Sequence, residues 1–310
     1  MQHKKTAILL ILFLLSYTTF SQDSDKNKLF EHTNYEFPFQ LDKPDKLWEL
    51  PKSLIEISGL SYIDKHRIAC VQDEKGNIYV YHLKSGEIEQ KVSFGNDGDY
   101  EGIEIIENDV WILKSNGTLY EVKDYLKDTD PHVKKYTTAL SGKNDAEGLT
   151  YDPIHNKLLI ACKGHPFVDD KAGKEFKAIY SFDLKSKQLD IKPYLLIEMD
   201  TIKYYKNYNT MTRLGIELLA YFDASKGDVS FQPSGIAIHP ITGNVFILAS
   251  VGNLLLVFSR ASKMLAMIEL KSAYHPKPEG ICFGPDGTLY ISNEGDDNSK
   301  GTILKFKARD

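Results

Sequence analysis

The chain has 310 residues, of which 42% are hydrophobic and 26% charged, a balance typical of a soluble globular protein. With only 21 Gly and 12 Pro, the composition excludes a collagen-like or disordered chain. The formal net charge of −5 argues against a protein that binds nucleic acid by neutralising phosphates. The 18 Tyr and 15 Phe against 5 Met favour strands over a helical bundle.

The amino terminus has the pattern of a secretory signal peptide. Lys4 and Lys5 precede an unbroken apolar run, Ala7–Leu15, and the small residues Thr18 and Ser21 follow it. The run is short for a transmembrane span. We therefore expect residues 1–21 to be cleaved and the protein to be secreted or periplasmic. The alternative is an uncleaved anchor, which would be the only contact with a membrane.

The three cysteines are too few and too far apart for a disulfide framework. Cys70, Cys162 and Cys282 each lie in an apolar stretch, and the chain contains no CxxC motif. We expect three buried small apolar side chains rather than a redox pair or a zinc site.

A repeat organises most of the chain. Five short segments align on a glycine, and these glycines stand 43, 46, 87 and 45 residues apart. Each segment is followed by further short apolar strands separated by turns. The five anchor segments are Ile57–Ser61, Tyr100–Glu104, Ala146–Thr150, Pro233–Ala237 and Pro278–Cys282.

Four antiparallel strands repeating about every 45 residues predict an all-β fold, a β-propeller with four-stranded blades. Each anchor glycine would let the innermost strand begin close to the axis, where a Cβ would crowd its neighbours. We expect one propeller domain over residues 45–310, preceded by an extended lead-in over residues 22–44. The last repeat ends after three strands, and the segment around Lys46–Leu50 is expected to supply its outer strand.

The number of blades depends on the 87-residue gap, which equals two repeats. Residues 199–222 lie in this gap and carry apolar residues near helical spacing, without the strand-and-turn pattern of a blade. We therefore predict five blades with a helical insertion at 199–222, and six blades are the alternative.

Carboxylates recur at one position of the repeat. The residue before the anchor glycine is Ser58, Glu101, Glu147, Ser234 or Glu279 in successive repeats. In a propeller these positions surround one end of the axis. The second strand of a blade returns to this end, which adds Asp73, Asn293 and Glu294 to the candidates.

Crowded carboxylates repel one another unless a cation neutralises them, and hard oxygen ligands suit calcium better than magnesium. The sequence thus predicts a Ca²⁺ site with Glu101, Glu147 and Glu279 as ligands. Asp73, Asn293 and Glu294 are expected in or near the ligand shell. The alternative is that each glutamate accepts backbone N–H bonds from the adjoining blade and only spaces the ring.

The anchors YEGIE, AEGLTYD, PSGIAIHP and PEGICFGPDGTLYISNEG resemble those of the SdiA-regulated family of exported bacterial β-propellers, over residues 45–308. The resemblance implies a five-bladed propeller with a calcium site. It also implies a more distant similarity to NHL-repeat and gluconolactonase-like propellers.

Two functions fit these features. The first is a calcium-bearing module that binds an unknown ligand or protein in the cell envelope, as a monomer. The second is a metal-dependent hydrolase of lactones or phosphoesters, with Glu294 or Asp73 as the base. Common nucleotide-binding and protease motifs are absent from the sequence, and no residue can be assigned a catalytic role with certainty.

Overall fold

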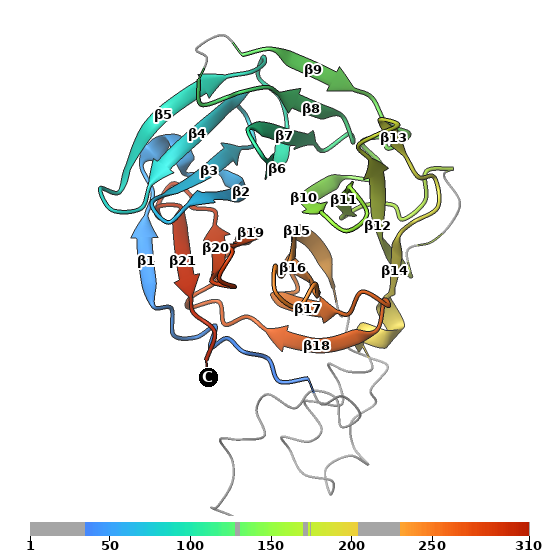
Figure 1. Cartoon of the computed structure of the whole chain (residues 1–310). Helices are drawn as coiled ribbons and strands as arrows, with labels where there is room; N and C mark the ends of the chain where they lie inside the picture. The colour runs from blue at the N-terminus through green and yellow to red at the C-terminus, as the bar shows by residue number, and fades with distance from the viewer. Residues whose placement is uncertain (1–34, 128–130, 170–172, 174, 204–229, 310) are drawn as a thin grey trace, which may run out of the picture.

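A computed structural model describes residues 35–127, 131–169, 173, 175–203 and 230–309. Its strands form five antiparallel sheets arranged around one axis, a five-bladed β-propeller (Figure 1). The prediction of five blades is confirmed. The expected signal peptide, residues 1–21, lies outside the described residues.

Each blade follows the chain from its innermost strand outward. Blade 1 consists of β2 (Ile57–Asp64), β3 (Arg67–Gln72), β4 (Asn77–His82) and β5 (Glu87–Ser93). Blade 2 consists of β6 (Tyr100–Ile106), β7 (Asp109–Lys114), β8 (Leu119–Val122) and β9 (Val133–Tyr136). Blade 3 consists of β10 (Ala146–Asp152), β11 (Lys157–Cys162) and β12 (Phe176–Asp183), with β13 (Gln188–Leu189) and β14 (Leu195–Glu198) both paired to β12. Blade 4 consists of β15 (Gln232–Ile238), β16 (Val245–Val251), β17 (Leu254–Phe258) and β18 (Met264–Glu269).

Blade 5 combines strands from both ends of the domain. It consists of β19 (Pro278–Phe283), β20 (Leu289–Asn293), β21 (Thr302–Phe306) and, as its outer strand, β1 (Lys46–Glu49). The predicted closure by the early segment is confirmed. A 3₁₀ turn, η2 (Lys52–Leu54), then leads into blade 1. The indole N–H of Trp48 donates to the backbone oxygen of Leu83 in blade 1 at 2.6 Å, which fixes the closing strand to the first blade as well.

The described part of the lead-in, residues 35–44, packs against the last two blades. Phe37, Phe39 and Leu41 are buried in the apolar cluster between blades 4 and 5. The Nε2 atom of His275 lies 2.9 Å from the backbone oxygen of Leu41. This segment therefore joins the rim of the propeller before β1 begins.

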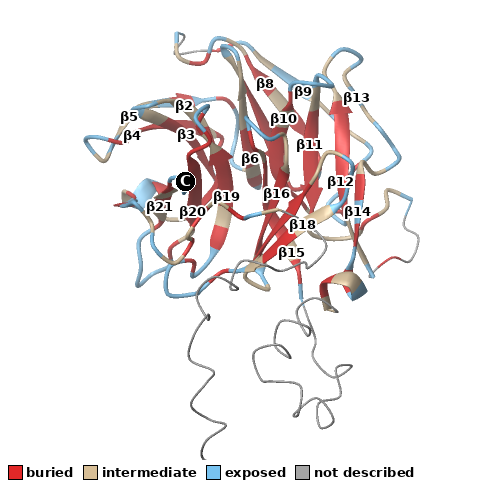
Figure 2. Cartoon of the chain, turned by 60° about the horizontal axis from the view of Figure 1, so that its bottom comes forward, coloured by how far each residue is buried: buried red, intermediate tan, exposed pale blue. Residues whose placement is uncertain are grey.

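The described buried apolar residues fall into five clusters, one at each interface between neighbouring blades. Figure 2 shows the buried residues along the strands and the exposed residues mainly in the turns. Burial of both faces explains the near-continuous apolar strands such as β16 and β17. The blades thus hold one another through their faces, and the inner edges remain around the axis.

The three cysteines and the start of the predicted insertion lie within the described residues. Cys70, Cys162 and Cys282 are free and buried, as predicted. Residues 199–203 are helical, and the remainder of the predicted insertion lies outside the described residues. Within the described part of the chain, no helix combines the length and apolar character needed to cross a membrane.

Candidate functional site

The innermost strand of every blade carries an irregularity at its anchor. In β6, β10 and β15 the pairing register shifts between the glycine and the residue two positions before it. In β2 and β19 the shift spans the glycine itself. The residue before the glycine is therefore left without a regular partner, and a β-bulge of this kind redirects a side chain. This irregularity places the predicted site residues at equivalent points of the ring.

The anchor glycines are required by the close approach of neighbouring blades. A Cβ on Gly148 would lie 2.7 Å from the backbone nitrogen of Ile236, and one on Gly235 would lie 2.6 Å from the backbone oxygen of Glu279. Such distances are too short for an unstrained contact. The predicted crowding of inner strands is confirmed, and it brings the residues before the glycines close together.

The second strands return to this end of the ring, as expected. The backbone N–H of Lys163 donates to the oxygen of Asp145 at 2.8 Å, and that of Glu294 donates to the oxygen of Lys277 at 2.9 Å. The N–H of Asp73 donates to the oxygen of Glu56 at 3.3 Å. We call this end, with the residues before the anchor glycines and the ends of the second strands, the mouth.

Glu101, Glu147 and Glu279 lie close enough at the mouth to affect one another. Burial, and then the charge of Glu147, raises the pKa of Glu101, whose carboxyl also hydrogen-bonds with Asp99. Burial, followed by Glu147, raises the pKa of Glu279 to about 8. Glu147 is 4% exposed, and its pKa is also raised by burial. Because Glu101 and Glu147 hydrogen-bond with each other, the pair retains a shared proton more strongly than isolated carboxyls do.

Lys163 supplies a positive charge to this group. Its Nζ atom lies 2.8 Å from Oε1 of Glu147 and 3.9 Å from Oδ2 of Asp145. Burial alone would lower the pKa of Lys163. The neighbouring carboxylates, Glu147 first, outweigh burial, so the pKa of Lys163 is raised overall. The Lys163 ammonium therefore favours the ionised form of Glu147, whereas burial and the neighbouring carboxyls favour the protonated form of Glu101.

The remaining predicted residues form the side of the mouth between blades 5 and 1. Glu294 pairs with Lys277, and its charge also acts on Glu279. Burial, followed by Glu56 and Glu294, raises the pKa of Asp73 to about 6. The Oδ1 atom of Asp73 is buried without a hydrogen-bond partner.

Asn293 also leaves an acceptor unsatisfied. It is 1% exposed, and its Nδ2 atom donates to the backbone oxygen of Tyr274 at 3.3 Å and to Oγ1 of Thr302 at 3.2 Å. Its Oδ1 atom is buried without a partner. A buried acceptor without a donor is costly, and water or a cation can satisfy it.

A hydroxyl before one anchor glycine joins two neighbouring blades. The Oγ of Ser234 donates to the backbone oxygen of Pro278 in the next blade at 2.8 Å. Glu101 and Glu147 interact with the side chains of Asp99 and Lys163 and with one another. Whether the glutamates also space the ring stays a prediction.

One acidic residue of an innermost strand escaped the sequence prediction. Glu104 lies on β6, two residues after Gly102, and burial raises its pKa to about 8. The prediction considered only the residue before each glycine. A comparison of the residue two positions after it would have found Glu104 as the one carboxyl among the five repeats.

The mouth combines two carboxyls whose pKa values are raised by burial with the ammonium group of Lys163. In the described part of the chain, no group of three or more His, Cys, Asp or Glu side chains is arranged to hold a metal ion. The Lys163 ammonium acts on Glu101 and Glu279 as well as on Glu147. The carboxyl oxygens suit a hard cation, but Lys163 already forms an ion pair with Oε1 of Glu147.

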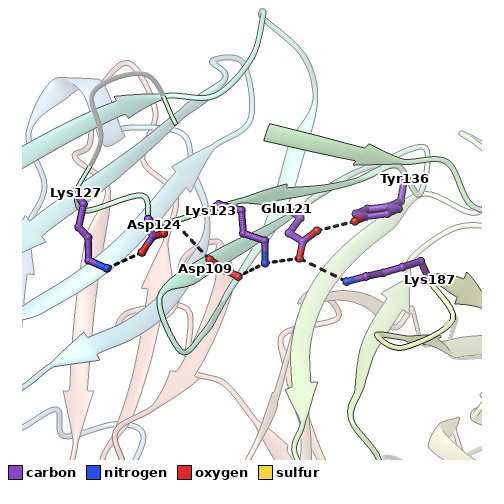
Figure 3. Close-up of polar contacts among 7 residues, drawn as sticks. All are labelled: Asp109, Glu121, Lys123, Asp124, Lys127, Tyr136 and Lys187. Atoms are coloured by element: carbon purple, nitrogen blue, oxygen red, sulfur yellow. Dashed lines mark hydrogen bonds and ion pairs between the residues drawn. The ribbon is translucent and has the colours of Figure 1, made fainter. Parts of the chain in front are cut away.

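A second polar cluster lies away from the mouth, on blade 2 and the turn between β12 and β13 (Figure 3). The buried Glu121 accepts a hydrogen bond from the Tyr136 hydroxyl at 2.6 Å and pairs with Lys123 at 2.8 Å. Lys187 reaches Glu121 at 3.5 Å, and its Nζ atom lies 4.3 Å from the centre of the Trp111 ring. The cluster is satisfied internally, and it links blade 2 to blade 3.

An open polar depression of about 660 Å³ lies at the edge of blade 4. The turn between β16 and β17 and residues 269–272 line it. None of the predicted site residues contributes to it, so it is separate from the carboxylates of the mouth.

Comparison with known proteins identifies the fold. No protein-family model matches the chain, and no curated protein matches it. The glutaminyl cyclase of Myxococcus xanthus is similar in structure, with 11% identity over 86% of this chain and 96% of that chain, at a TM-score of 0.54. This similarity shows the fold alone.

Two further solved structures are similar at lower scores. A luciferin-regenerating enzyme has 12% identity over 86% of this chain and 96% of that chain, with a TM-score of 0.47. The virginiamycin B lyase of Staphylococcus aureus has 13% identity over 84% of this chain and 73% of that chain, with a TM-score of 0.43. The resemblance to the SdiA-regulated family remains a prediction.

Proposed function

We propose that this chain is an exported binding propeller whose mouth takes a calcium ion together with an envelope ligand or protein. The observation that carries the proposal is the group of three glutamates on equivalent β-bulges, one buried and two half-buried, in which Glu147 acts on the other two. Such a group is stabilised when a cation neutralises it.

The residues that would hold the ion are Glu101, Glu147 and Glu279. The unsatisfied oxygens of Asp73 and Asn293 offer further neutral or anionic donors beside them. Bound calcium would supply a fixed double charge at the mouth, which would orient an anionic or carbonyl-bearing ligand.

Calcium and Lys163 would compete for the same carboxylate. The Lys163 ammonium lies 2.8 Å from Oε1 of Glu147, so it must move away before that oxygen can bind an ion. Removing the ammonium therefore strengthens calcium binding in this proposal, whereas removing the carboxylates abolishes it.

Calorimetric titration of calcium into chelator-treated protein tests this directly, with the melting temperature recorded at each step. We expect heat of binding and a higher melting temperature for the wild type. Lys163→Met should bind more tightly, and the triple variant Glu101→Gln, Glu147→Gln, Glu279→Gln should not bind. Exposed Glu87→Gln on β5 is the matched control. Equal calcium affinity in the wild type and the triple variant would refute the assignment.

A second function is favoured by the unequal states of Glu101 and Glu147. A protonated carboxyl beside an ionised one is the arrangement that general acid–base catalysis needs. In a hydrolase of lactones or phosphoesters, Glu101 would donate a proton to the leaving oxygen, and Glu147 would accept one from water.

The two functions differ in turnover. A screen of lactones and phosphodiesters, with and without calcium, should show hydrolysis that is lost in Glu101→Gln if the mouth is catalytic. Calcium binding without turnover of any substrate would leave the binding function.

A further inference from the structure

The end of the propeller opposite the mouth, which we call the far face, carries two turns of the same build. Each inner strand begins at the mouth and ends at the far face, where a turn leads into the second strand. In blades 3 and 4 this turn has a proline followed by an isoleucine, namely Pro153 and Ile154 in one and Pro240 and Ile241 in the other. The two isoleucines therefore occupy equivalent positions in neighbouring blades.

Both turns are fixed in shape by a buried side chain at their start. The backbone N–H of Ile154 donates to Oδ1 of Asp152 at 3.1 Å. The backbone N–H of Ile241 donates to Nδ1 of His239 at 3.3 Å. Asp152 is 1% exposed and His239 is 5% exposed, so the blade beneath each turn holds the acceptor in place.

The two isoleucines are exposed to an extent that is unusual for such large apolar side chains. Ile154 is 70% exposed and Ile241 is 69% exposed. A single exposed apolar side chain is common on a soluble protein and needs no explanation. Here the same residue type recurs at the same point of two adjacent turns. These side chains gain apolar burial only when another surface covers both turns.

The charges beside these turns indicate what kind of surface fits. Blades 3 and 4 each place two turns on the far face, and the exposed titratable side chains of these four turns are His155, Lys185 and Lys263. The chain as a whole has a formal net charge of −5. The far face of these two blades is therefore basic on a protein that is acidic overall, and a negatively charged partner fits it.

The carboxylates closest to these turns have basic partners of their own. Oδ2 of Asp152 lies 2.7 Å from Nη1 of Arg260 and 2.7 Å from Nδ1 of His155. Arg260 follows β17 of blade 4, so this ion pair joins the two blades beneath the exposed isoleucines. Asp190 pairs with Lys157 at 2.6 Å. These carboxylates therefore do not offset the exposed lysines of the far face.

We propose that the far face of blades 3 and 4 docks on an anionic lipid bilayer, with Ile154 and Ile241 inserted among the headgroups. Turns at one end of a propeller can meet a flat surface together. A bilayer interface offers apolar contacts to the isoleucines and negative charge to Lys185 and Lys263. The mouth then faces the aqueous side. This docking does not depend on calcium at the mouth.

A fluorescent bimane label on an introduced cysteine reports whether a turn touches lipid. The native cysteines are buried, so the label attaches to Ile154→Cys or to the control Val251→Cys. Val251 is 43% exposed and ends β16 at the mouth, whereas Ile241 precedes the same strand at the far face. A local label is needed because the apolar run Ala7–Leu15 binds lipid by itself wherever it is retained.

The labelled full-length chains are mixed, in the presence of a chelator, with vesicles that contain brominated lipid, which quenches bimane on contact. One set of vesicles is phosphatidylcholine alone, and the other also contains phosphatidylglycerol. We expect the phosphatidylglycerol vesicles to quench the label at position 154 and to leave the label at position 251 bright. Vesicles of phosphatidylcholine alone should quench position 154 much less.

Second substitutions in the chain labelled at position 154 test each contribution. Ile241→Ser should raise the lipid concentration for half-maximal quenching roughly tenfold, because it removes an apolar side chain from the interface. Lys263→Gln should raise it roughly fivefold on phosphatidylglycerol vesicles and leave phosphatidylcholine vesicles unaffected. Val251→Ser should change neither value, and all variants should keep the melting temperature of the parent.

Three results would overturn the proposal. The first is a label at position 154 that no vesicle quenches, or that is quenched no more than the label at position 251. The second is equal quenching by neutral and anionic vesicles. The third is a blue shift of the label at position 154 that grows with protein concentration without lipid, because it would assign the two turns to contact with a second copy of this chain.

Discussion

Replacing Glu104 by glutamine should make the folded protein less sensitive to alkaline pH. In the folded state, burial raises the pKa of this carboxyl from 4.5 to about 8. Between these values the unfolded chain is ionised while the folded chain keeps its proton. The folded state therefore binds more protons, and its stability falls as the pH rises from about 4.5 to about 8. Below pH 4.5 the carboxyl is neutral in both states and contributes no pH dependence.

The size of this effect follows from the pKa shift. At about 1.4 kcal/mol for each pKa unit, a rise from 4.5 to about 8 corresponds to an upper limit of about 5 kcal/mol at alkaline pH. Because Glu104 is half-buried, contact with water will reduce the penalty, so we expect roughly 2–5 kcal/mol. In a protein of this size that range corresponds to about 4–15 °C in melting temperature.

Thermal melts of the wild type and Glu104→Gln from pH 4.5 to pH 9 measure this difference. The curves should differ least at the acid end and separate steadily up to about pH 8, with Glu104→Gln the more stable protein. Glu87→Gln should follow the wild type throughout, because Glu87 is exposed. A constant difference across the whole pH range would show that the charge of Glu104 is not the cause.

Three further predictions concern the framework. Gly148→Ala should lower the free energy of unfolding in urea by about 1–3 kcal/mol, because the added Cβ would lie 2.7 Å from the backbone of the next blade. The control Gly142→Ala should change it little, since nothing lies within 4 Å of the added Cβ. Trp48→Ala should cost about 3–5 kcal/mol by the same method and increase cleavage of β1 by proteases, because this buried ring holds the closing strand to blade 1. Lys187→Met should lower the melting temperature by several degrees, because Lys187 joins the buried carboxylate of blade 2 to blade 3 (Figure 3). Lys127→Met breaks only an exposed ion pair, so it should change the free energy of unfolding by less than about 1 kcal/mol and leave the melting temperature almost unchanged.

The repeat made most of the fold predictable. Glycines such as Gly102 and Gly148 mark where inner strands touch, because no other residue fits there, and their spacing alone indicates the size of a blade. The closing role of β1 was predictable from the missing strand of the last repeat. The pairing of both β13 and β14 with β12 in blade 3 was not predictable, because β13 has only two residues and shows no alternation of apolar and polar residues.

The position of the candidate site could be predicted from the sequence, but the contacts among its side chains could not. Equivalent positions in a repeat must converge on the axis, and this places Glu101, Glu147 and Glu279 together. Which cation balances them depends on side-chain reach. The direct pairing of Lys163 with Glu147 could be seen only in three dimensions.

The closing strand has a consequence for the order in which the molecule can be completed. β1 pairs with β21, and in register Glu49 faces Thr302, so about 250 residues must be synthesised before β1 finds its partner. Until then the edge of β1 and the apolar side chains of Phe37 and Phe39 have no surface to cover. During synthesis the first strand therefore stays unpaired until the last strand of the domain has been made. Truncation near the carboxyl end would leave that strand open to pairing with other chains. The ring can therefore close only in a chain that has been synthesised as far as β21.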